Sequence, residues 1–173
     1  MNELTHDQVL IVDTARAFAR DKLRPNAARW EEEGLDRGVL KQLAELGFAG
    51  IYVRDDVGGS GLSRHDAALI FEELSRGCVA TAAFLSIHNM CAWMIDAFGD
   101  EEQRRKVLPK LTAMETIASY CLTEPGSGSD AGALRTSAKP DGNAHYLMNG
   151  SKAFISGAGF SDLYIVMSRT GEA

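Results

Sequence analysis

The feature that most constrains this chain is a change of character near residue 115. The first 115 residues carry 33 charged side chains, whereas the last 58 carry nine. Apolar residues of the first part recur at helical spacing, and the second part consists of short β-prone runs separated by turn residues. One uniform bundle or one uniform sheet cannot satisfy both patterns. We therefore expect a helical domain over residues 1–115, followed by the first strands of a β domain over residues 116–173.

Capping patterns mark where helices of the first part begin. In these patterns a Ser, Thr or Asp and a second polar residue three positions later satisfy free backbone N–H groups at a helix start. The pairs are Thr5 with Gln8, Ser63 with Asp66, and Asp100 with Gln103. We expect further helices from Asp36 to Leu46 and from Val79 to Phe98. Pro25 should bend the first helix, and Pro109 should end the last helix early.

One apolar stretch has the length of a membrane span. Residues 77–95 contain no Lys, Arg, Asp or Glu, and about 20 such residues cross a bilayer. Polar Ser86, His88 and Asn89 interrupt the stretch and no basic flank follows, so we expect a buried helix instead. The first residues also lack the basic segment and apolar run of a secretory signal.

Charge and cysteine content exclude other classes of protein. The net charge is −6 and no basic stripe appears, so binding to nucleic acid through its phosphates is not expected. Cys78, Cys91 and Cys121 are far apart, which indicates reduced thiols in a cytoplasmic compartment rather than a disulfide scaffold. His88 and Cys91 lie three residues apart, but without a third ligand nearby we expect a packed helix and no metal.

The β-prone part contains clear strand and turn signals. Residues 117–122 and Leu163 to Met167 are predicted strands. Pro140-Asp141-Gly142 and Asn149-Gly150 are predicted turns between short strands.

A Gly/Ser-rich run follows the first predicted strand, which ends at Leu122. Pro125 fixes one backbone dihedral, and Gly126 and Gly128 let the backbone approach a ligand closely. Neighbouring N–H groups can then form a cradle for the polar edge of a ligand. A plain turn is the other interpretation, since the run is neither a dinucleotide-binding nor a Walker A pattern.

The same run carries a resemblance to a known family. Cys121 to Ala133, C-L-T-E-P-G-S-G-S-D-A-G-A, resembles the first signature of the acyl-CoA dehydrogenase family. Val57–Leu62 and Asn149–Ala158 are similar to further family segments at family-like spacing, so the resemblance covers essentially the whole chain. It implies an α+β fragment: an all-α N-terminal domain followed by the first strands of a β-barrel-like middle domain. The family's C-terminal helical domain, with its catalytic glutamate, is absent, so no catalytic residue is expected in this chain.

The resemblance also implies an activity. Family members use FAD to oxidise an acyl-CoA thioester to the trans-2-enoyl-CoA, in fatty-acid or branched-chain amino-acid catabolism. They pass electrons to an electron-transfer flavoprotein and usually form homotetramers. Residues 85–89 resemble the short branched-chain branch, which oxidises isobutyryl-CoA, and Ser86 to Met90 lie where relatives line the acyl pocket. An acyl-CoA oxidase or flavin monooxygenase on the same fold, and a non-catalytic binding chain, are the alternatives.

Two segments take the site residues that the resemblance implies. Flavin contacts are expected from Tyr120, Cys121, Leu122, Thr123, Glu124, Pro125, Gly126, Ser127, Gly128 and Ser129, and from Phe154, Ile155 and Ser156. Thr123 should hydrogen-bond the isoalloxazine by its hydroxyl and N–H, Ser129 should contact the acyl-CoA, and the Ser156 hydroxyl should reach N5. The family commonly has Trp-x-Thr in the second segment. Phe154 therefore keeps an aromatic face but loses the indole donor.

Overall fold

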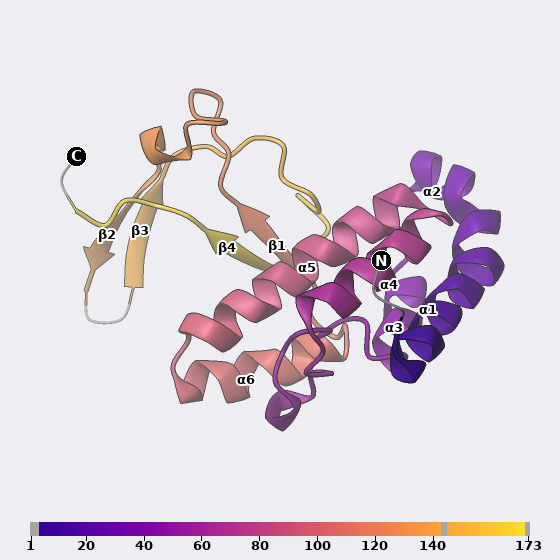
Figure 1. Ribbon diagram of the computed structural model, residues 1–173. Helices are drawn as coiled ribbons and strands as arrows, with labels where there is room; N and C mark the ends of the chain where they lie inside the picture. Colours follow the sequence, from indigo (N-terminus) through magenta and orange to yellow (C-terminus); the bar gives the residue numbers. More distant parts are fainter. Residues whose placement is uncertain (1–3, 143–144, 172–173) are drawn as a thin grey trace. The chain divides into compact units, whose positions relative to one another are not determined.

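The computed structural model describes residues 4–142 and 145–171 and separates the chain into two compact units, 1–117 and 118–173. The first unit is helical and the second contains the strands (Figure 1). The helices are α1 (His6–Phe18), α2 (Ala27–Glu33), α3 (Arg37–Glu45), α4 (Arg64–Ser75), α5 (Val79–Phe98) and α6 (Glu101–Thr112). The strands are β1 (Ala118–Cys121), β2 (Ser137–Asp141), β3 (His145–Asn149) and β4 (Leu163–Val166).

The helix boundaries follow the capping signals. Reciprocal side-chain and backbone hydrogen bonds cap α1, α4 and α6 at the three predicted pairs. Pro25 lies in a 3-10 turn, Arg24–Asn26, that separates α1 from α2 after a π-helical turn, Ala19–Leu23, so the predicted bend is confirmed. The prediction for Pro109 is wrong, because α6 continues to Thr112. Burial of Leu108 and Leu111 on the inner face outweighs the one intrahelical hydrogen bond that proline removes.

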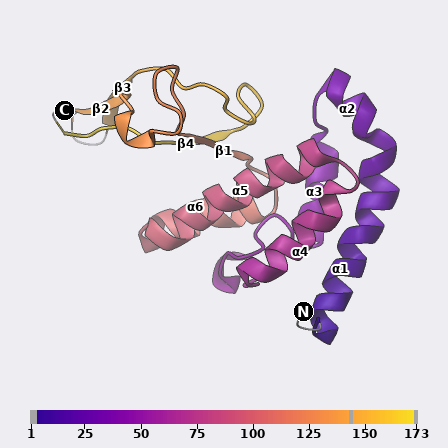
Figure 2. The ribbon, with the colours of Figure 1, turned by 45° about the horizontal axis from the view of Figure 1, so that its top comes forward.

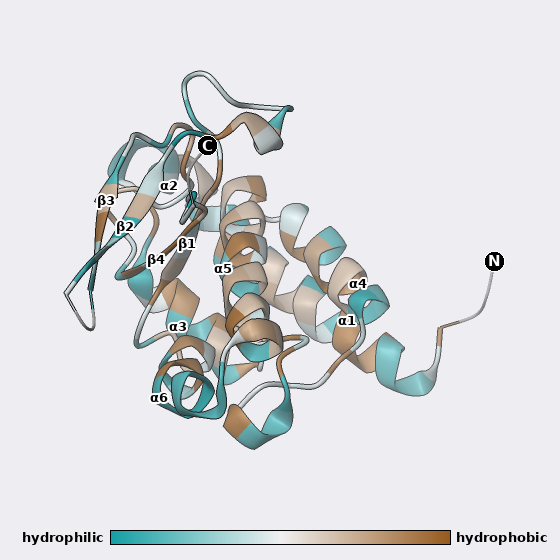
Figure 3. Cartoon of the chain, turned by 90° about the vertical axis from the view of Figure 1, so that its left-hand side faces the viewer, coloured by the Kyte–Doolittle hydropathy of each residue, from teal (hydrophilic) through white to brown (hydrophobic). Residues whose placement is uncertain are grey.

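Helix α5 is the central element of the helical unit. It packs between α4 and α6, and α1 lies along α4 (Figures 1 and 2). Figure 3 shows α5 mostly in the hydrophobic colours, while α6 carries more hydrophilic residues. The guanidinium of Arg16 on α1 donates two hydrogen bonds, 3.1 and 3.0 Å, to the buried carboxylate of Glu73 on α4. Apolar burial and this ion pair together hold α1 against the rest of the unit.

Of the helices in the described part of the chain, none is both long enough and apolar enough to cross a membrane.

His88 and Asn89 on α5 lie fully inside the core and bind backbone atoms of neighbouring elements. Asn89 accepts a hydrogen bond from the Ile51 N–H at 2.8 Å and donates to the Phe48 carbonyl at 2.8 Å. His88 Nε2 lies 3.0 Å from the Leu111 carbonyl. Burial lowers the pKa of His88 to about 4, so the ring is neutral at pH 7 and Nε2 carries the proton for this bond. Asn89 thus joins the connector after α3 to the central helix, and His88 joins α6 to it.

An ion-pair network around the buried Arg104 and Asp96 fixes the glycine-rich loop before α4. The Arg104 guanidinium contacts the carboxylates of Asp56, Asp96 and Glu101 at 2.8, 2.9 and 2.6 Å. Arg54 adds a 3.0 Å bond from its Nε to Asp96. Gly59 packs so tightly here that a Cβ would lie 2.0 Å from the Val53 carbonyl oxygen. Arg54 and Asp56 therefore hold the loop to Asp96 and Arg104. The loop backbone leaves no room for a side chain at position 59.

The strand unit contains two small sheets. β1 and β4 are parallel in the register Ala118↔Leu163 to Cys121↔Val166, and β2 and β3 form an antiparallel hairpin. Arg169 joins the sheets, since its carbonyl accepts from the Ala138 N–H and its own N–H donates to the Thr136 carbonyl, both at 2.8 Å. The strands predicted at 117–122 and 163–167 are confirmed, each slightly shorter than expected.

The predicted turn at Pro140-Asp141-Gly142 needs a correction. Pro140 and Asp141 are the last residues of β2, and the turn begins only at Gly142, whose φ is 74°. A two-stranded ribbon has open edges, so a residue without an N–H is tolerated within it.

Replacement of Asn89 by leucine tests the role of the polar core. The change strands the Ile51 N–H and the Phe48 carbonyl inside the unit, and each buried unpaired group costs about 1–3 kcal/mol. We expect a lower free energy of unfolding by at least that amount, measured by urea denaturation followed by circular dichroism. Asn26→Ala, which removes a surface amide, is the matched control and should change stability by less than about 1 kcal/mol. Equal losses in the two variants would contradict this account.

Candidate functional site

The candidate site begins where β1 ends. Residues 124–127 form a tight turn closed by two backbone bonds, from the Glu124 N–H to the Ser127 carbonyl at 2.9 Å and in the reverse direction at 3.1 Å. The Ser127 hydroxyl donates to the Asp130 carbonyl at 2.6 Å. No atom lies within 4 Å of a Cβ placed at Gly126 or Gly128. The inner side of the run is thus internally bonded and its outer side is open to a ligand.

A buried ion pair connects this run to the second segment. Lys152 Nζ lies 2.8 Å from Glu124 Oε1, and the two side chains are 10% and 7% exposed. The same ammonium donates to the Leu122 carbonyl at 2.9 Å. The Glu124 carboxylate also accepts from the backbone N–H groups of Arg135 and Thr136 at 2.6 and 2.9 Å. We call this arrangement the Glu124–Lys152 clasp.

The donors of the clasp hold the pKa of the Glu124 carboxyl well below its usual range, with Lys152 the largest cause. The carboxylate is therefore ionised at neutral pH. Gly150 makes the approach of the second segment possible, because a Cβ there would lie 2.4 Å from the Thr136 hydroxyl oxygen.

Thr123 lies between the two residues that Lys152 contacts. Its carbonyl accepts a hydrogen bond from the Ala153 N–H at 2.9 Å. Its own N–H and hydroxyl have no hydrogen-bond partner among the residues that the structure describes. One side of this residue is fixed by the second segment, and the other side offers two donors.

The second segment is anchored again at its far end. The Ser119 hydroxyl on β1 donates to the Ser156 carbonyl, and it lies 2.6 Å from the Ser161 hydroxyl. Between these anchors, Phe154 has a φ of 56° and its side chain is 96% exposed. An aromatic ring is thus presented to solvent by a short stretch whose two ends are bonded to β1 and to the run after it.

The structure separates the predicted site residues by accessibility. Ser129, Phe154 and Ser156 are exposed, and Thr123 is half-buried with free donors. Glu124 and Ser127 are buried with their side chains engaged, so any ligand contact from these two comes from the backbone. Of the remaining predicted residues, Cys121 is buried, whereas Tyr120, Leu122 and Ile155 are half-buried and Pro125, Gly126 and Gly128 are exposed. Burial raises the pKa of the Cys121 thiol, which is therefore not a ready nucleophile.

Sequence reasoning missed Lys152 and the backbone donors of Arg135 and Thr136. A signal for the lysine exists, because the last 58 residues carry only nine charged side chains. Lys152 lies directly before the second predicted segment, in a region with few charges. A charged side chain in such a region needs an opposite charge nearby. The pairing with Glu124, 28 residues earlier in the sequence, is not visible without the fold.

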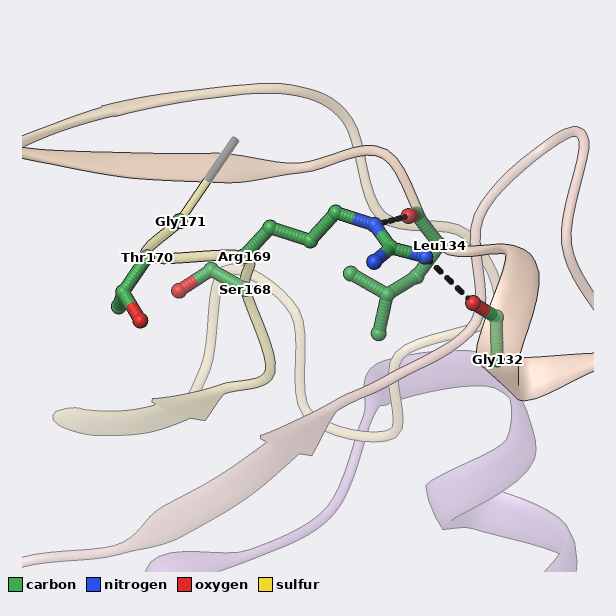
Figure 4. Close-up of a pocket in the computed structure, with 6 residues that line it drawn as sticks. All are labelled: Gly132, Leu134, Ser168, Arg169, Thr170 and Gly171. Atoms are coloured by element: carbon green, nitrogen blue, oxygen red, sulfur yellow. Dashed lines mark hydrogen bonds between the residues drawn. The ribbon is translucent and has the colours of Figure 1, made fainter. Parts of the chain in front are cut away.

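The described part of this unit contains several hollows, two of which are of similar size. One of about 340 Å³ is lined by Glu124, Pro125 and Gly126 together with Ala133, Arg135, Thr136, Gly150 and Ser151. Another of about 350 Å³ lies beside Arg169, whose guanidinium donates to the carbonyls of Leu134 and Gly132 at 2.7 and 2.6 Å (Figure 4). The second hollow contains none of the predicted site residues. Only the first belongs to the candidate site.

The fold is that of an α+β chain in which a helical unit leads into a strand unit, and the strand unit carries an open glycine-containing turn. Two family models match this chain: the acyl-CoA dehydrogenase N-terminal domain over residues 5–115 and the acyl-CoA dehydrogenase middle domain over residues 119–173. The chain belongs to the acyl-CoA dehydrogenase family.

Individual relatives agree with the family models. The chain is 61% identical over 97% of its length to the mitochondrial isobutyryl-CoA dehydrogenase of Dictyostelium discoideum, and 53% identical over 97% to that of Bos taurus. A solved structure of an acyl-CoA dehydrogenase complexed with FAD from Bacillus anthracis matches 97% of the chain with a TM-score of 0.90 and 34% identity, over 29% of its own length. The chain spans 40% of the length of each of the two isobutyryl-CoA dehydrogenases.

The clasp predicts an acid-dependent stability. The folded state favours the ionised Glu124, whose ordinary pKa is 4.5, so it binds a proton less tightly than the unfolded state. The stabilisation is therefore present above about pH 4.5 and is lost as the pH falls below it. In Glu124→Gln we expect a flatter decline of unfolding free energy between about pH 5 and pH 3, measured by urea titrations at each pH. The control Asp141→Asn removes an exposed carboxyl of the same unit and should follow the wild-type decline; an unchanged slope in Glu124→Gln would contradict the clasp.

Proposed function

We propose that this chain supplies the helical domain and the first strands of the middle domain of an FAD-dependent acyl-CoA dehydrogenase that oxidises a short branched acyl-CoA, with isobutyryl-CoA as the first candidate. The observation that carries the proposal is the 61% identity to a relative named isobutyryl-CoA dehydrogenase. The reaction is an α,β-dehydrogenation of the thioester to the trans-2-enoyl-CoA. It is assigned to a protein of the relatives' length, since this chain spans 40% of it.

The residues present fit a flavin. Thr123 offers an N–H and a hydroxyl without partners in the described chain, and the space outside Gly126 and Gly128 is open. The exposed ring of Phe154 supplies an aromatic face. When bound, FAD supplies the acceptor for the hydride that leaves the substrate β-carbon. Donors fixed beforehand stabilise charge that develops on a bound ring at no further reorganisation cost, which is the role we propose for Thr123.

The other site residues take complementary roles in this proposal. Ser129, exposed at the end of the run, donates to the acyl-CoA, and the exposed Ser156 hydroxyl donates to the flavin. Glu124 accepts hydrogen bonds from Lys152 and two backbone N–H groups, so it orders the cradle and does not take the substrate α-proton. We assign that proton to a glutamate in the part of the relatives that this chain does not span.

The substrate preference rests on identity more than on visible pocket residues. His88 and Asn89, which share the family-like stretch of α5, are fully buried and bind backbone atoms of the helical unit. Ser86, Ile87 and Met90 are half-buried and remain available for an acyl pocket. The resemblance of this stretch to the branched-chain branch is therefore partly a resemblance of core packing.

Acceptor, assembly and location belong to the same proposal. We propose an electron-transfer flavoprotein as the electron acceptor and a homotetramer as the assembly of the protein at its relatives' length. The sequence favours a cytoplasmic location, while the two isobutyryl-CoA dehydrogenases named above are mitochondrial. The location therefore stays a prediction that fractionation of the source cells decides.

Thr123→Val tests the flavin assignment. The variant keeps the shape and the backbone N–H but removes the hydroxyl donor, and the loss of one such bond weakens binding by about 1 kcal/mol, or roughly fivefold. We expect a lower FAD affinity and a shifted flavin absorption band in the protein of the relatives' length. Thr170→Val, which lies outside the candidate site, is the control. A variant with unaltered affinity and spectrum would remove Thr123 from the proposed site.

Turnover assays test the proposed reaction. Residues 1–173 with FAD, acyl-CoA and an artificial electron acceptor should show no dye reduction above the flavin blank, because loss of a general base typically costs 10²–10⁴-fold. The protein of the relatives' length should reduce dye fastest with isobutyryl-CoA. A preference for acyl chains of about twelve carbons would overturn the substrate proposal. Each buried CH₂ contributes about 0.8 kcal/mol to binding, and only a long pocket can bury so many of them. Reaction with oxygen in place of the dye would favour the oxidase alternative.

A further inference from the structure

Phe154 has an unfavourable backbone conformation that its own side chain does not explain. Two non-glycine residues in the described part of the chain have a positive φ, Met114 at 52° and Phe154 at 56°. The left-handed region is costly for any residue with a Cβ. Met114 is 2% exposed, so packing of its side chain offsets that cost. The Phe154 side chain is 96% exposed and gains no such packing.

Hydrogen bonds on either side of Phe154 offset the cost of its positive φ, which packing of its side chain does not offset. On the N-terminal side, Lys152 binds the Glu124 carboxylate and the Leu122 carbonyl, and the Ala153 N–H donates to the Thr123 carbonyl. On the C-terminal side, the Ser156 carbonyl accepts from the Ser119 hydroxyl. Strained conformations persist only where the surroundings determine them.

Proton counting shows that the C-terminal anchor is a directed chain. Ser119 has one hydroxyl proton, and it is donated to the Ser156 carbonyl. The Ser161 hydroxyl, 2.6 Å away, must therefore be the donor to Ser119. Ser119 is fully buried, so bulk water does not compete for this hydroxyl.

We propose that Lys152 and Ser119 are positioning residues that hold Phe154 in the left-handed conformation, so that its ring stands outward as a preformed platform for a flat ligand. The identity of that ligand as flavin rests on the proposed function; the positioning itself does not. Because the ring is in place before the ligand binds, less conformational entropy of this segment is lost on binding.

A comparison of glycine with alanine at position 154 measures the imposed conformation without any ligand. Glycine adopts a positive φ freely, so Phe154→Gly should exceed Phe154→Ala in folding equilibrium constant by about fivefold, or about 1 kcal/mol. In the Ser119→Ala or Lys152→Met background the segment can relax. Alanine should then equal glycine or exceed it by about twofold, because glycine has more freedom to lose on folding.

This readout separates positioning from a general structural role. A Ser119 that merely stabilises the unit would lower both position-154 variants alike and leave their ratio at about five. Ala158→Gly is the matched control, since Ala158 is exposed in the same segment and has no positive φ. It should destabilise the chain by the same factor in every background. A glycine-to-alanine ratio at position 154 that does not respond to either anchor overturns the inference.

Two further measurements keep the test decisive. If an anchor variant does not fold, the backbone ¹³C chemical shifts of Phe154 in the unsubstituted chain report the sign of φ, and an ordinary helical or extended value overturns the inference. Riboflavin binding, followed by fluorescence quenching, then tests the ligand. A ratio that responds to the anchors while no position-154 variant alters riboflavin binding would leave the positioning intact and remove the flavin assignment.

Discussion

The ion pair between Glu124 and Lys152 organises the strand unit. Lys152 reaches back to the run after β1, and through it the carbonyl of Leu122 and the carboxylate of Glu124 are satisfied at once. That carboxylate also takes the N–H groups of Arg135 and Thr136, which lead into β2. A buried pair of this kind is stabilising only when its remaining donors and acceptors are satisfied, and here both oxygens of the Glu124 carboxylate accept hydrogen bonds. Loss of either partner leaves a buried charge and several backbone groups without bonds.

The helical unit follows the same principle with different residues. Its core is apolar, but the positions of its connectors are set by buried polar groups: Asn89 binds backbone atoms, and Arg104 binds the carboxylates of Asp56 and Asp96. In both units most buried polar side chains of the described residues bind the chain itself, and the exceptions are the Trp30 indole N–H and the Thr136 hydroxyl. The Thr123 donors are different, because they lie next to the open space outside Gly126 and Gly128. Free donors beside an open turn are what mark the candidate site.

Much of the fold follows from local sequence rules, because capping and turn chemistry act within a few residues. Thr5, Ser63 and Asp100 begin their helices as predicted, and the strands at 118–121 and 163–166 fall inside the predicted runs. Pro109 does not end its helix, since burial elsewhere on α6 overrides the local penalty. The two site segments were visible as sequence patterns. Their connection was not, because the partner of Lys152 lies 28 residues away and the φ of Phe154 depends on bonds at both ends of its segment.

The central claim is that Glu124 and Lys152 act as one unit that joins the two site segments. A double-mutant cycle of Glu124→Gln, Lys152→Met and the double variant, followed by urea unfolding of the 173-residue chain, measures their coupling directly. The account predicts strong non-additivity: each single change strands the other partner, so the double variant should lose little more stability than either single variant. Additive losses would show that the two side chains stabilise the unit independently, and would contradict the account.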